Sequence, residues 1–378
     1  MKTPSICIMT SVHRHDDVRI YHKEAKSLRQ MGCRVTILCP DYEGTDELGI
    51  QFRKVSVPKG RFARMLTASR RFAREAARIP ADFYHFHDPE LLGAGLRLSR
   101  KGRVIYDIHE DVPRQILTKP YLKPWAAKLA SRWMERRERK AVRRLFGVVA
   151  AEPVIYERMK GFCRHLALVC NYPILSEFTE PQLDFSRRED KVCYLGGITE
   201  IRGAFEMLEA VREGCPAELL LAGEYETEEL RRRMEAHPGF ARASYLGFLT
   251  RPQVREMLSQ VKAGLVTLHP TPKYQTALPV KMFEYMIAEV PVIASNFPYW
   301  SDIVNDAGCG ICVDPMKPEE IRGAVDYICR HPDIAREMGR NGREKVLEKY
   351  NWDREKEKLF TLYREGGAVF PAERKEEP

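Results

Sequence analysis

Short apolar runs alternate with amphipathic helical stretches from the first residues onward. The apolar run at 5–10 predicts a strand, the polar loop at 11–20 leads into a helix at 21–31, and 35–40 is a second strand. Strand, helix and strand in this order indicate a doubly wound α/β domain. Four more strands are predicted within residues 82–91, 104–113, 145–151 and 167–174.

The same alternation starts again in the second half of the chain. An acidic segment containing a proline precedes residue 191, and a strand, a glycine pair and a helix then follow within 191–204. Further strands are predicted at 219–224, 243–248 and 263–269. We therefore expect two α/β domains, at 1–172 and 173–352, followed by a helix at 353–365 and a tail at 366–378 that becomes charged and disordered from residue 373.

The stretch 278–295 predicts a helix, a buried strand and a candidate ligand site. Its apolar residues recur at i, i+3 and i+7, as on one face of a helix: Val280, Phe283 and Ile287. Lys281 and Glu284 share a different face. The positive N-terminus of a helix with a lysine in its first turn suits a phosphate, and the carboxylate one turn later suits hydroxyl groups. The alternative is an ordinary solvated ion pair.

Histidine side chains end two of the predicted strands. His85 and His87 close one strand and His109 closes the next, at the sheet edge where open α/β sheets bind ligands. His85 and His87 lie two positions apart and share one face, so a metal pair is one interpretation and a structural role is the other. No further ligand has the spacing of a recognised site, and we predict no metal.

The residues around Lys281 resemble the nucleotide-sugar signature of retaining glycosyltransferases of the GT-B type, family four. Glu284-Tyr-Met-Ile matches the second of the two family glutamates, which holds the donor ribose. Thr276 stands where the family has the first glutamate, eight positions earlier. Lys281 is typical of a branch that reads Pro-x-Lys-x-x-Glu-Tyr-Met.

Other motifs along the chain extend the resemblance to nearly its whole length. The loop with Ser11 and His13 is similar to a branch with Ser-Val-His and Asp-x-Arg-Ile, and His109 matches the strand-end histidine that contacts the transferred sugar. Gly196 and Gly197 occupy the family's Gly-Arg pair, so one phosphate cation is lost while Arg202 keeps the second. The loop at Gly247 corresponds to the one beside the nucleotide base.

The resemblance implies a GT-B fold, with two Rossmann-like doubly wound domains facing across a cleft and the helix 353–365 packing back on the first domain. It implies hexosyl transfer with retention, from a nucleoside-diphosphate-sugar donor to a glycan or lipid-linked acceptor, in cell-surface polysaccharide or glycolipid synthesis. Arg202 and Lys281 would stabilise the leaving diphosphate, with His109 as the third catalytic residue and no cofactor.

Composition and charge indicate the compartment of the protein and the kind of partner that it could bind. No run of eighteen apolar residues occurs and the chain begins directly with a strand, so we expect a cytoplasmic protein whose ten cysteines are reduced. Residues 1–172 hold 34 Lys and Arg against 18 Asp and Glu, whereas the remainder is acidic. Segment 119–144 alone has ten cations and two acids, with an apolar line at Leu122, Trp125, Leu129 and Trp133.

That basic segment predicts either a helix on an anionic membrane surface or an ordinary helix with a solvated outer face. We favour no nucleic-acid partner. Two rival functions remain, and they fall in different classes. One is a sugar-nucleotide epimerase on the same fold, and the other is a non-catalytic protein that binds membranes or nucleic acid through its basic half.

Overall fold

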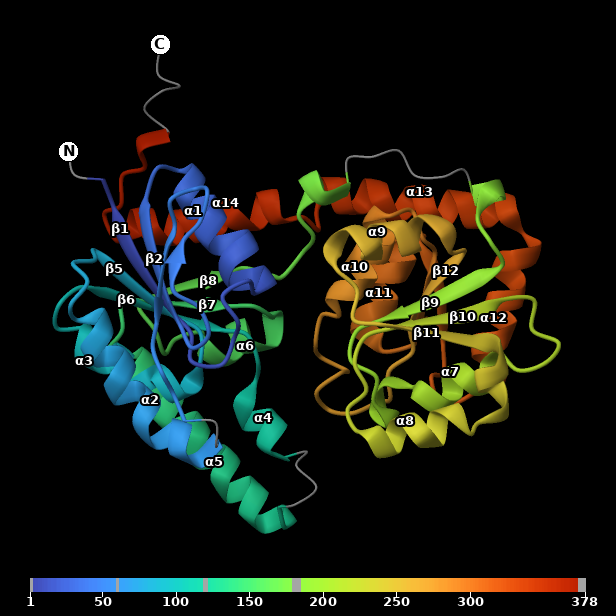
Figure 1. Cartoon of the computed structure of the whole chain (residues 1–378), viewed down its shortest axis with the longest axis horizontal. Helices are drawn as coiled ribbons and strands as arrows, with labels where there is room; N and C mark the ends of the chain where they lie inside the picture. Colours follow the sequence, from blue (N-terminus) through green and yellow to red (C-terminus); the bar gives the residue numbers. More distant parts are fainter. Residues whose placement is uncertain (1–2, 59–60, 118–121, 179–184, 373–378) are drawn as a thin grey trace. The chain divides into compact units, whose positions relative to one another are not determined.

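The computed structural model describes residues 3–58, 61–117, 122–178 and 185–372. The chain divides into two compact units, which we describe separately. Unit 1 comprises Met1–Asn171 together with Trp352–Pro378, and unit 2 comprises Tyr172–Asn351. Each unit is built on its own parallel sheet with helices packed against it (Figure 1), so the predicted two α/β domains are confirmed.

The sheet of unit 1 has the strand order β3-β4-β2-β1-β5-β6-β7-β8 and is parallel except for the pair β3–β4. Its strands are β1 Ser5–Met9, β2 Arg34–Cys39, β3 Gly44–Thr45, β4 Gln51–Lys54, β5 Phe83–Phe86, β6 Arg103–Ile108, β7 Gly147–Ala150 and β8 His165–Leu168. All five residues of β1 are buried, because helices cover both faces of a doubly wound sheet. The strand order reverses between β1 and β5, so loops after these strands meet at one edge.

The helices of unit 1 begin with a π-helix, Val18–Ala25, which continues as α1, Lys26–Gln30. The others are α2 Arg61–Ala76, the 3-10 turn Pro89–Leu91, α3 Leu92–Leu98, α4 Val112–Leu117, α5 Pro124–Val142, α6 Pro153–Met159 and α14 Trp352–Glu365. The first helix starts earlier than the predicted residue 21. Asp17 accepts hydrogen bonds from the backbone N–H groups of Arg19 and Ile20 and so caps the helix one turn sooner.

The last helix, α14, belongs to unit 1. Trp352 Nε1 donates to Ser27 Oγ at 2.9 Å, and Glu355 Oε2 accepts from the backbone N–H of Cys170 at 2.7 Å. The chain after α14 still packs, since Phe370 is buried against Phe360. The charged end predicted from residue 373 lies outside the described residues.

The sheet of unit 2 has the order β11-β10-β9-β12-β13-β14 and is parallel throughout. Its strands are β9 Lys191–Leu195, β10 Glu218–Ala222, β11 Ala243–Gly247, β12 Ala263–Val266, β13 Val292–Ser295 and β14 Gly310–Val313. Its helices are α7 Ala204–Ala210, α8 Glu228–Glu235, α9 Arg251–Gln260, α10 Val280–Ile287, α11 Pro298–Ala307, α12 Pro318–Arg330 and α13 Pro332–Glu348. Short 3-10 turns lie at Leu175–Phe178, Phe185–Arg187, Glu200–Arg202 and Pro238–Arg242.

Helix α10 is buried more completely than its sequence predicts. Phe283 and Ile287 lie inside, as expected, but Met282, Tyr285 and Met286 on the other sides are equally buried. The helix packs against α13 and against the sheet, so it has no solvated face. The strand order of this sheet reverses between β9 and β12, and α10 follows β12 in the chain. Open α/β sheets bind their ligands at such a reversal, beyond the carboxyl ends of the strands.

Candidate functional site

The glycine pair of unit 2 lies next to two cationic side chains, Lys281 and Arg202. Gly196 and Gly197 follow β9, and Gly196 adopts a φ of +121°. A Cβ atom on Gly196 would lie 3.3 Å from Lys281 Nζ, and one on Gly197 would lie 3.1 Å from Arg202 Nη1. The pair therefore leaves room for both cations at the carboxyl end of the strand.

Lys281 lies in the first turn of α10, and its ammonium nitrogen is buried. Nζ sits 3.5 Å from the centroid of the Tyr194 ring and makes no hydrogen bond with any residue that the structure describes. Burial holds the pKa of Lys281 well below its usual value, and the nearby Arg202 guanidinium lowers this pKa further. A buried ammonium that makes no hydrogen bond with the described residues is costly, so this position suits an anionic ligand.

Arg202 is held in place by its own hydrogen bonds. Its Nε donates to Tyr274 Oη at 3.1 Å, and its Nη1 donates to the carbonyl of Gly197 at 3.1 Å. Gly203 after it is left-handed at φ +78°, and a Cβ there would come within 2.1 Å of the Thr267 carbonyl. Only glycine fits this approach, which fixes Arg202 beside the glycine pair.

Glu284 is engaged by an arginine that sequence reasoning missed. Arg251, the first residue of α9, donates from Nη1 to Glu284 Oε1 at 2.5 Å and from Nη2 to Glu177 Oε2 at 2.5 Å. Ion pairing with these two carboxylates raises the pKa of Arg251 against the effect of its burial. The contacts orient the Glu284 carboxylate, as ribose binding would require. Glu284 and Glu177 lie 33 and 74 positions from Arg251 along the chain, so no local sequence spacing predicts these contacts.

Of the two other predicted donor residues of unit 2, Thr276 lies in a turn and Gly247 lies at the end of a strand. Thr276 Oγ1 donates to the carbonyl of Lys273 at 3.3 Å, so its hydroxyl is used within its own turn. Gly247 ends β11 at φ +68°, and a Cβ there would meet no described atom within 4 Å. The exposed Phe248 follows it, which makes this strand end open and partly apolar.

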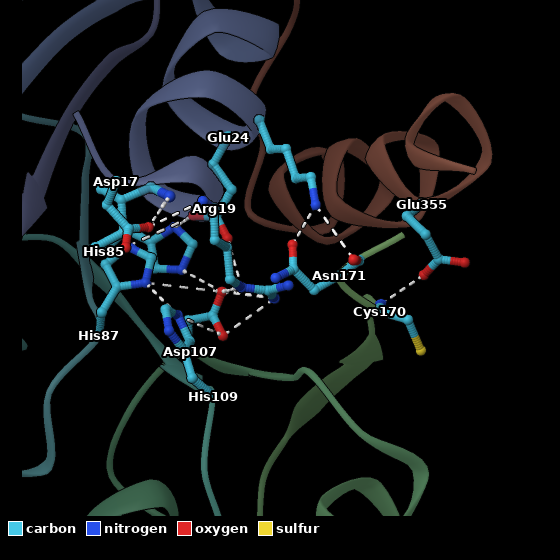
Figure 2. Close-up of polar contacts among 12 residues, drawn as sticks. Asp17, Arg19, Glu24, His85, His87, Asp107, His109, Cys170, Asn171 and Glu355 are labelled. Carbon is cyan, nitrogen blue, oxygen red and sulfur yellow. Dashed lines mark hydrogen bonds and ion pairs between the residues drawn. The ribbon is translucent and has the colours of Figure 1, made fainter. Parts of the chain in front are cut away.

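In unit 1 the histidines predicted at strand ends converge on a buried carboxylate, Asp107 of β6 (Figure 2). Arg19 binds Asp107 with three hydrogen bonds of 2.9–3.2 Å, and His109 Nε2 lies 3.3 Å from Asp107 Oδ1. His87 Nδ1 lies 2.7 Å from His109 Nε2, and His85 Nδ1 lies 2.9 Å from Tyr363 Oη. His109 is the exposed member of the cluster, with 15% of its side chain accessible.

A second carboxylate, Glu24, completes this cluster. The π-helix places Glu24 five residues after Arg19 on the same side, with Arg19 Nε 3.1 Å from Glu24 Oε1. Burial, and then the neighbouring Asp107, raise the pKa of Glu24 well above its usual value. Burial alone would raise the pKa of Asp107 too, but the Arg19 guanidinium holds this pKa well below its usual value. Burial lowers the pKa of His85 to about 4 and that of His87 well below normal, so both are neutral at pH 7.

This cluster is also the group in the described part of the chain that could hold a metal ion. Glu24, His87, Asp107 and His109 offer ligand atoms within 4.8 Å of one another. The Arg19 guanidinium, however, already contacts both carboxylates and supplies the positive charge that a cation would bring. We therefore interpret the four residues as part of an ion-pair network around Arg19.

Ser11 and His13 lie beside this network, on the loop after β1. The backbone N–H of Ser11 donates to Asp88 Oδ2 at 2.6 Å, and Ser11 Oγ donates to Glu90 Oε1 at 2.8 Å. His13 Nδ1 lies 3.1 Å from Asp17, and its ring centroid is 5.6 Å from that of His109. Against burial, Asp17 and then Asp88 raise the pKa of His13.

The structure thus assembles the predicted residues into two groups, one in each unit. Ser11, His13 and His109 surround the carboxyl ends of β1, β5 and β6, and Gly196, Gly197, Arg202, Lys281 and Glu284 surround those of β9 and β12. Asp17 and Arg19 belong to the Asp-x-Arg-Ile motif, but sequence reasoning assigned no role to them or to the other acids and arginines behind these groups: Glu24, Asp88, Asp107, Glu177 and Arg251.

Comparison with known proteins matches both halves of the chain to families. Residues 176–345 match the family "Glycosyl transferases group 1", and residues 18–167 match "Glycosyltransferase Family 4". Alpha-D-kanosaminyltransferase of Streptomyces kanamyceticus is 25% identical over 181 residues, and alpha-maltose-1-phosphate synthase of Mycolicibacterium smegmatis is 27% identical over 189. These alignments cover 47% of this chain and 46% and 48% of the relatives, so the chain spans less than half of their length.

Solved structures resemble the chain over nearly all of it. Sucrose-phosphate synthase of Thermosynechococcus elongatus has a TM-score of 0.76 at 16% identity and covers 96% of this chain and 98% of its own. HepE of Anabaena, in complex with UDP and glucose, has a TM-score of 0.74 at 13% identity, and the match covers 96% of this chain and 100% of HepE. WaaG, a glycosyltransferase involved in lipopolysaccharide biosynthesis, has a TM-score of 0.69 at 13% identity, and the match covers 93% of this chain and 98% of WaaG. At these identities the likeness shows the fold.

Proposed function

This chain belongs to the glycosyltransferases of the group 1 and family 4 type, with the two parallel-sheet domains of the GT-B fold, and we propose that it transfers a sugar from a nucleoside-diphosphate donor to an acceptor hydroxyl. The observation that carries the proposal is the buried Lys281 ammonium, which makes no hydrogen bond with any described residue and lies beside Arg202. Two neighbouring cations at the start of a helix suit a diphosphate. Complexes of the structural neighbour HepE with UDP and with UDP-glucose support this donor class.

In the proposed reaction, unit 2 binds the nucleotide part of the donor. Glu284, oriented by Arg251, accepts hydrogen bonds from the ribose hydroxyls, and the open loop at Gly247 receives the base. Lys281 and Arg202 lie against the diphosphate. Arg202 is charged in the free protein, and the bound diphosphate favours the charged form of Lys281, so charge that grows on the leaving diphosphate meets partners that are already in place.

The chemical step breaks the bond between the anomeric carbon and the diphosphate oxygen, and the acceptor oxygen forms the new bond to that carbon. The acceptor proton passes to the leaving phosphate, and attack from the same face retains the anomeric configuration. Arg202 and Lys281 supply the electrostatic stabilisation, so the step needs no resident cofactor. The donor sugar is a hexose in this proposal, and the acceptor is a glycan or lipid-linked saccharide of cell-surface polysaccharide or glycolipid synthesis.

A thermal-shift screen with nucleoside diphosphates and their hexose esters tests the donor class, because a ligand that binds only the native state raises the melting temperature. Product formation with saccharide acceptors, followed by the anomeric configuration of the product, tests transfer and retention. Neither rival function is favoured by the comparisons. Interconversion of free sugar nucleotides without transfer would support the epimerase, and the absence of any donor-dependent shift would contradict the proposal.

Arg202→Ala and Glu284→Ala are each expected to weaken binding of the donor. Loss of a charged hydrogen-bond partner costs on the order of 1.5–3 kcal/mol, which is roughly a 10- to 150-fold higher Kd. Isothermal titration calorimetry measures this directly. Glu337→Ala, at an exposed position of α13, is the control and should leave the affinity close to that of the wild type. Wild-type affinity in both test variants would refute the assignment.

His109→Ala is expected to reduce turnover more than stability. The side chain is partly exposed at the end of β6, and in the proposal it contacts the transferred sugar, as the family resemblance implies. The kcat and the melting temperature of the variant should therefore diverge, with kcat about 100-fold lower, the scale of losing one positioned catalytic group. A large fall in melting temperature with full activity in the folded fraction would instead make His109 structural. His165→Ala, at a partly exposed histidine paired with Glu365, serves as the control.

A further inference from the structure

Helix α5 of unit 1 carries a line of large apolar side chains that the described part of unit 1 leaves exposed. Trp125, Leu129 and Trp133 recur every four residues along one side of the helix, and they are 65%, 59% and 59% exposed. The opposite side packs on the core of the unit through Met134, Ala141 and Val142. The predicted apolar line thus forms, except that Leu122 lies before the helix, and it is an outer face.

Every exposed charged side chain that the structure describes on α5 and beside its two ends is a cation. Lys128 and Arg132 flank the apolar line, and five further exposed cations continue toward the C-terminal end: Arg136, Arg137, Lys140, Arg143 and Arg144. Neither acid of the helix is fully exposed, and 30% of the Glu135 side chain is accessible. Glu135 pairs with Arg139 at 2.7 Å, and Glu138 is buried against Arg158 and Tyr106.

Chemistry of this kind matches one partner better than the others. Tryptophan favours the boundary between headgroups and acyl chains, while lysine and arginine beside it reach lipid phosphates. An acidic protein groove would meet the cations but need not admit two tryptophans and a leucine in a straight line. Nucleic acid would leave the leucine without a role. Among the described helices none is long and apolar enough to cross a bilayer, so contact is limited to the surface.

We propose that α5 docks unit 1 on membranes that contain anionic phospholipids, with Trp125, Leu129 and Trp133 entering the headgroup layer and the cations facing lipid phosphates. Leu117 at the end of α4, the helix that packs against α5, is exposed as well. A protein held in this way meets acceptors at the membrane surface. The docking surface shares no residue with the donor site of unit 2, so its failure leaves the proposed reaction untouched.

Co-sedimentation of the full chain with vesicles tests the proposal. The wild type should pellet with vesicles containing phosphatidylglycerol and remain in solution with pure phosphatidylcholine, and its binding should fall at least tenfold between 0.1 and 0.5 M salt, because the Debye length shortens from about 10 Å to under 5 Å. Two variant sets should each lose at least tenfold: Trp125→Ser with Leu129→Ser and Trp133→Ser, and Arg132→Gln with Arg136→Gln, Arg137→Gln and Lys140→Gln. All seven positions are exposed, so both sets should keep the wild-type melting temperature.

A matched control removes the same charge elsewhere. Arg212, Arg232, Arg330 and Arg340 of unit 2 are exposed, and their joint change to Gln should leave vesicle binding intact. Fluorescence adds an independent readout, since Trp300 and Trp352 are buried and any blue shift on adding vesicles comes from Trp125 and Trp133. Equal pelleting of wild type and both variant sets, equal pelleting on neutral vesicles, or binding to an RNA fragment or self-association in place of vesicle binding would overturn the proposal.

Discussion

Replacing Lys281 with methionine is expected to lower turnover and donor binding while raising the stability of the free protein. Removal of one preorganised charge partner of a transition state typically costs about 100- to 1,000-fold in kcat. The same ammonium is buried without a hydrogen bond to any described residue, and such a group costs on the order of 1–3 kcal/mol of stability. Methionine has a similar length and no charge, so the free variant should melt at a higher temperature.

The pH dependence of stability tests whether burial of the Lys281 ammonium destabilises the free protein. The folded pKa of Lys281 lies below its unfolded value near 10.5, so between these two values the unfolded chain binds more protons and stability rises with pH. That slope should be absent in Lys281→Met. Lys281→Arg controls for charge, because it keeps a cation and should restore part of donor binding without the gain in melting temperature. A variant that loses stability and keeps full activity would contradict both roles.

Binding of the donor should also take up protons. A diphosphate beside Lys281 raises the pKa of this lysine again, so donor affinity is expected to fall as the pH rises from the free-state pKa toward the pKa in the complex. Calorimetry in buffers of different ionisation enthalpy measures the uptake, and Lys281→Met should abolish it.

Replacing Arg19 with methionine is expected to destabilise unit 1 severely. The guanidinium binds Asp107 and Glu24, and both carboxylates are fully buried. Breaking a buried ion pair from one side costs about 3–5 kcal/mol, since it leaves the other charge without compensation. At roughly 2–4 °C per kcal/mol for a unit of this size, the melting temperature should fall by about 6–20 °C. Arg97→Met, on the partly exposed surface of α3, is the control with little expected effect.

The loss should depend on pH in a direction that identifies the cause. Glu24 has a raised pKa in the folded protein, so its stabilising contribution is present below about 4.5 and is lost as the pH rises through the folded value. Without Arg19 a charged Glu24 beside Asp107 becomes costlier still. Adding Glu24→Gln to Arg19→Met should therefore recover part of the stability at neutral pH. If the double variant is no more stable than Arg19→Met, the two carboxylates do not repel each other as the structure implies.

The sequence by itself determined the two α/β domains and the outline of the donor site. Strands buried on both faces are nearly continuous apolar runs, so most of them lie within a few residues of their predicted positions. β9 begins at the predicted residue, and the helix with Lys281 and Glu284 begins at Val280. Glycines, a lysine in a first helical turn and a strand-end histidine are local signals that can be identified without knowing what they contact.

Only the tertiary structure decided which residues contact and orient the predicted site residues. Arg19 and Glu24 meet because their segment is a π-helix, which aligns residues five apart, whereas an α-helical pattern would separate them. Arg251 reaches Glu284 across 33 positions, so the pairing depends on how α9 and α10 pack. The apolar line of α5 is equally compatible with a core face and an outer face, because exposure is set by the neighbours that fold against a helix and not by its own periodicity.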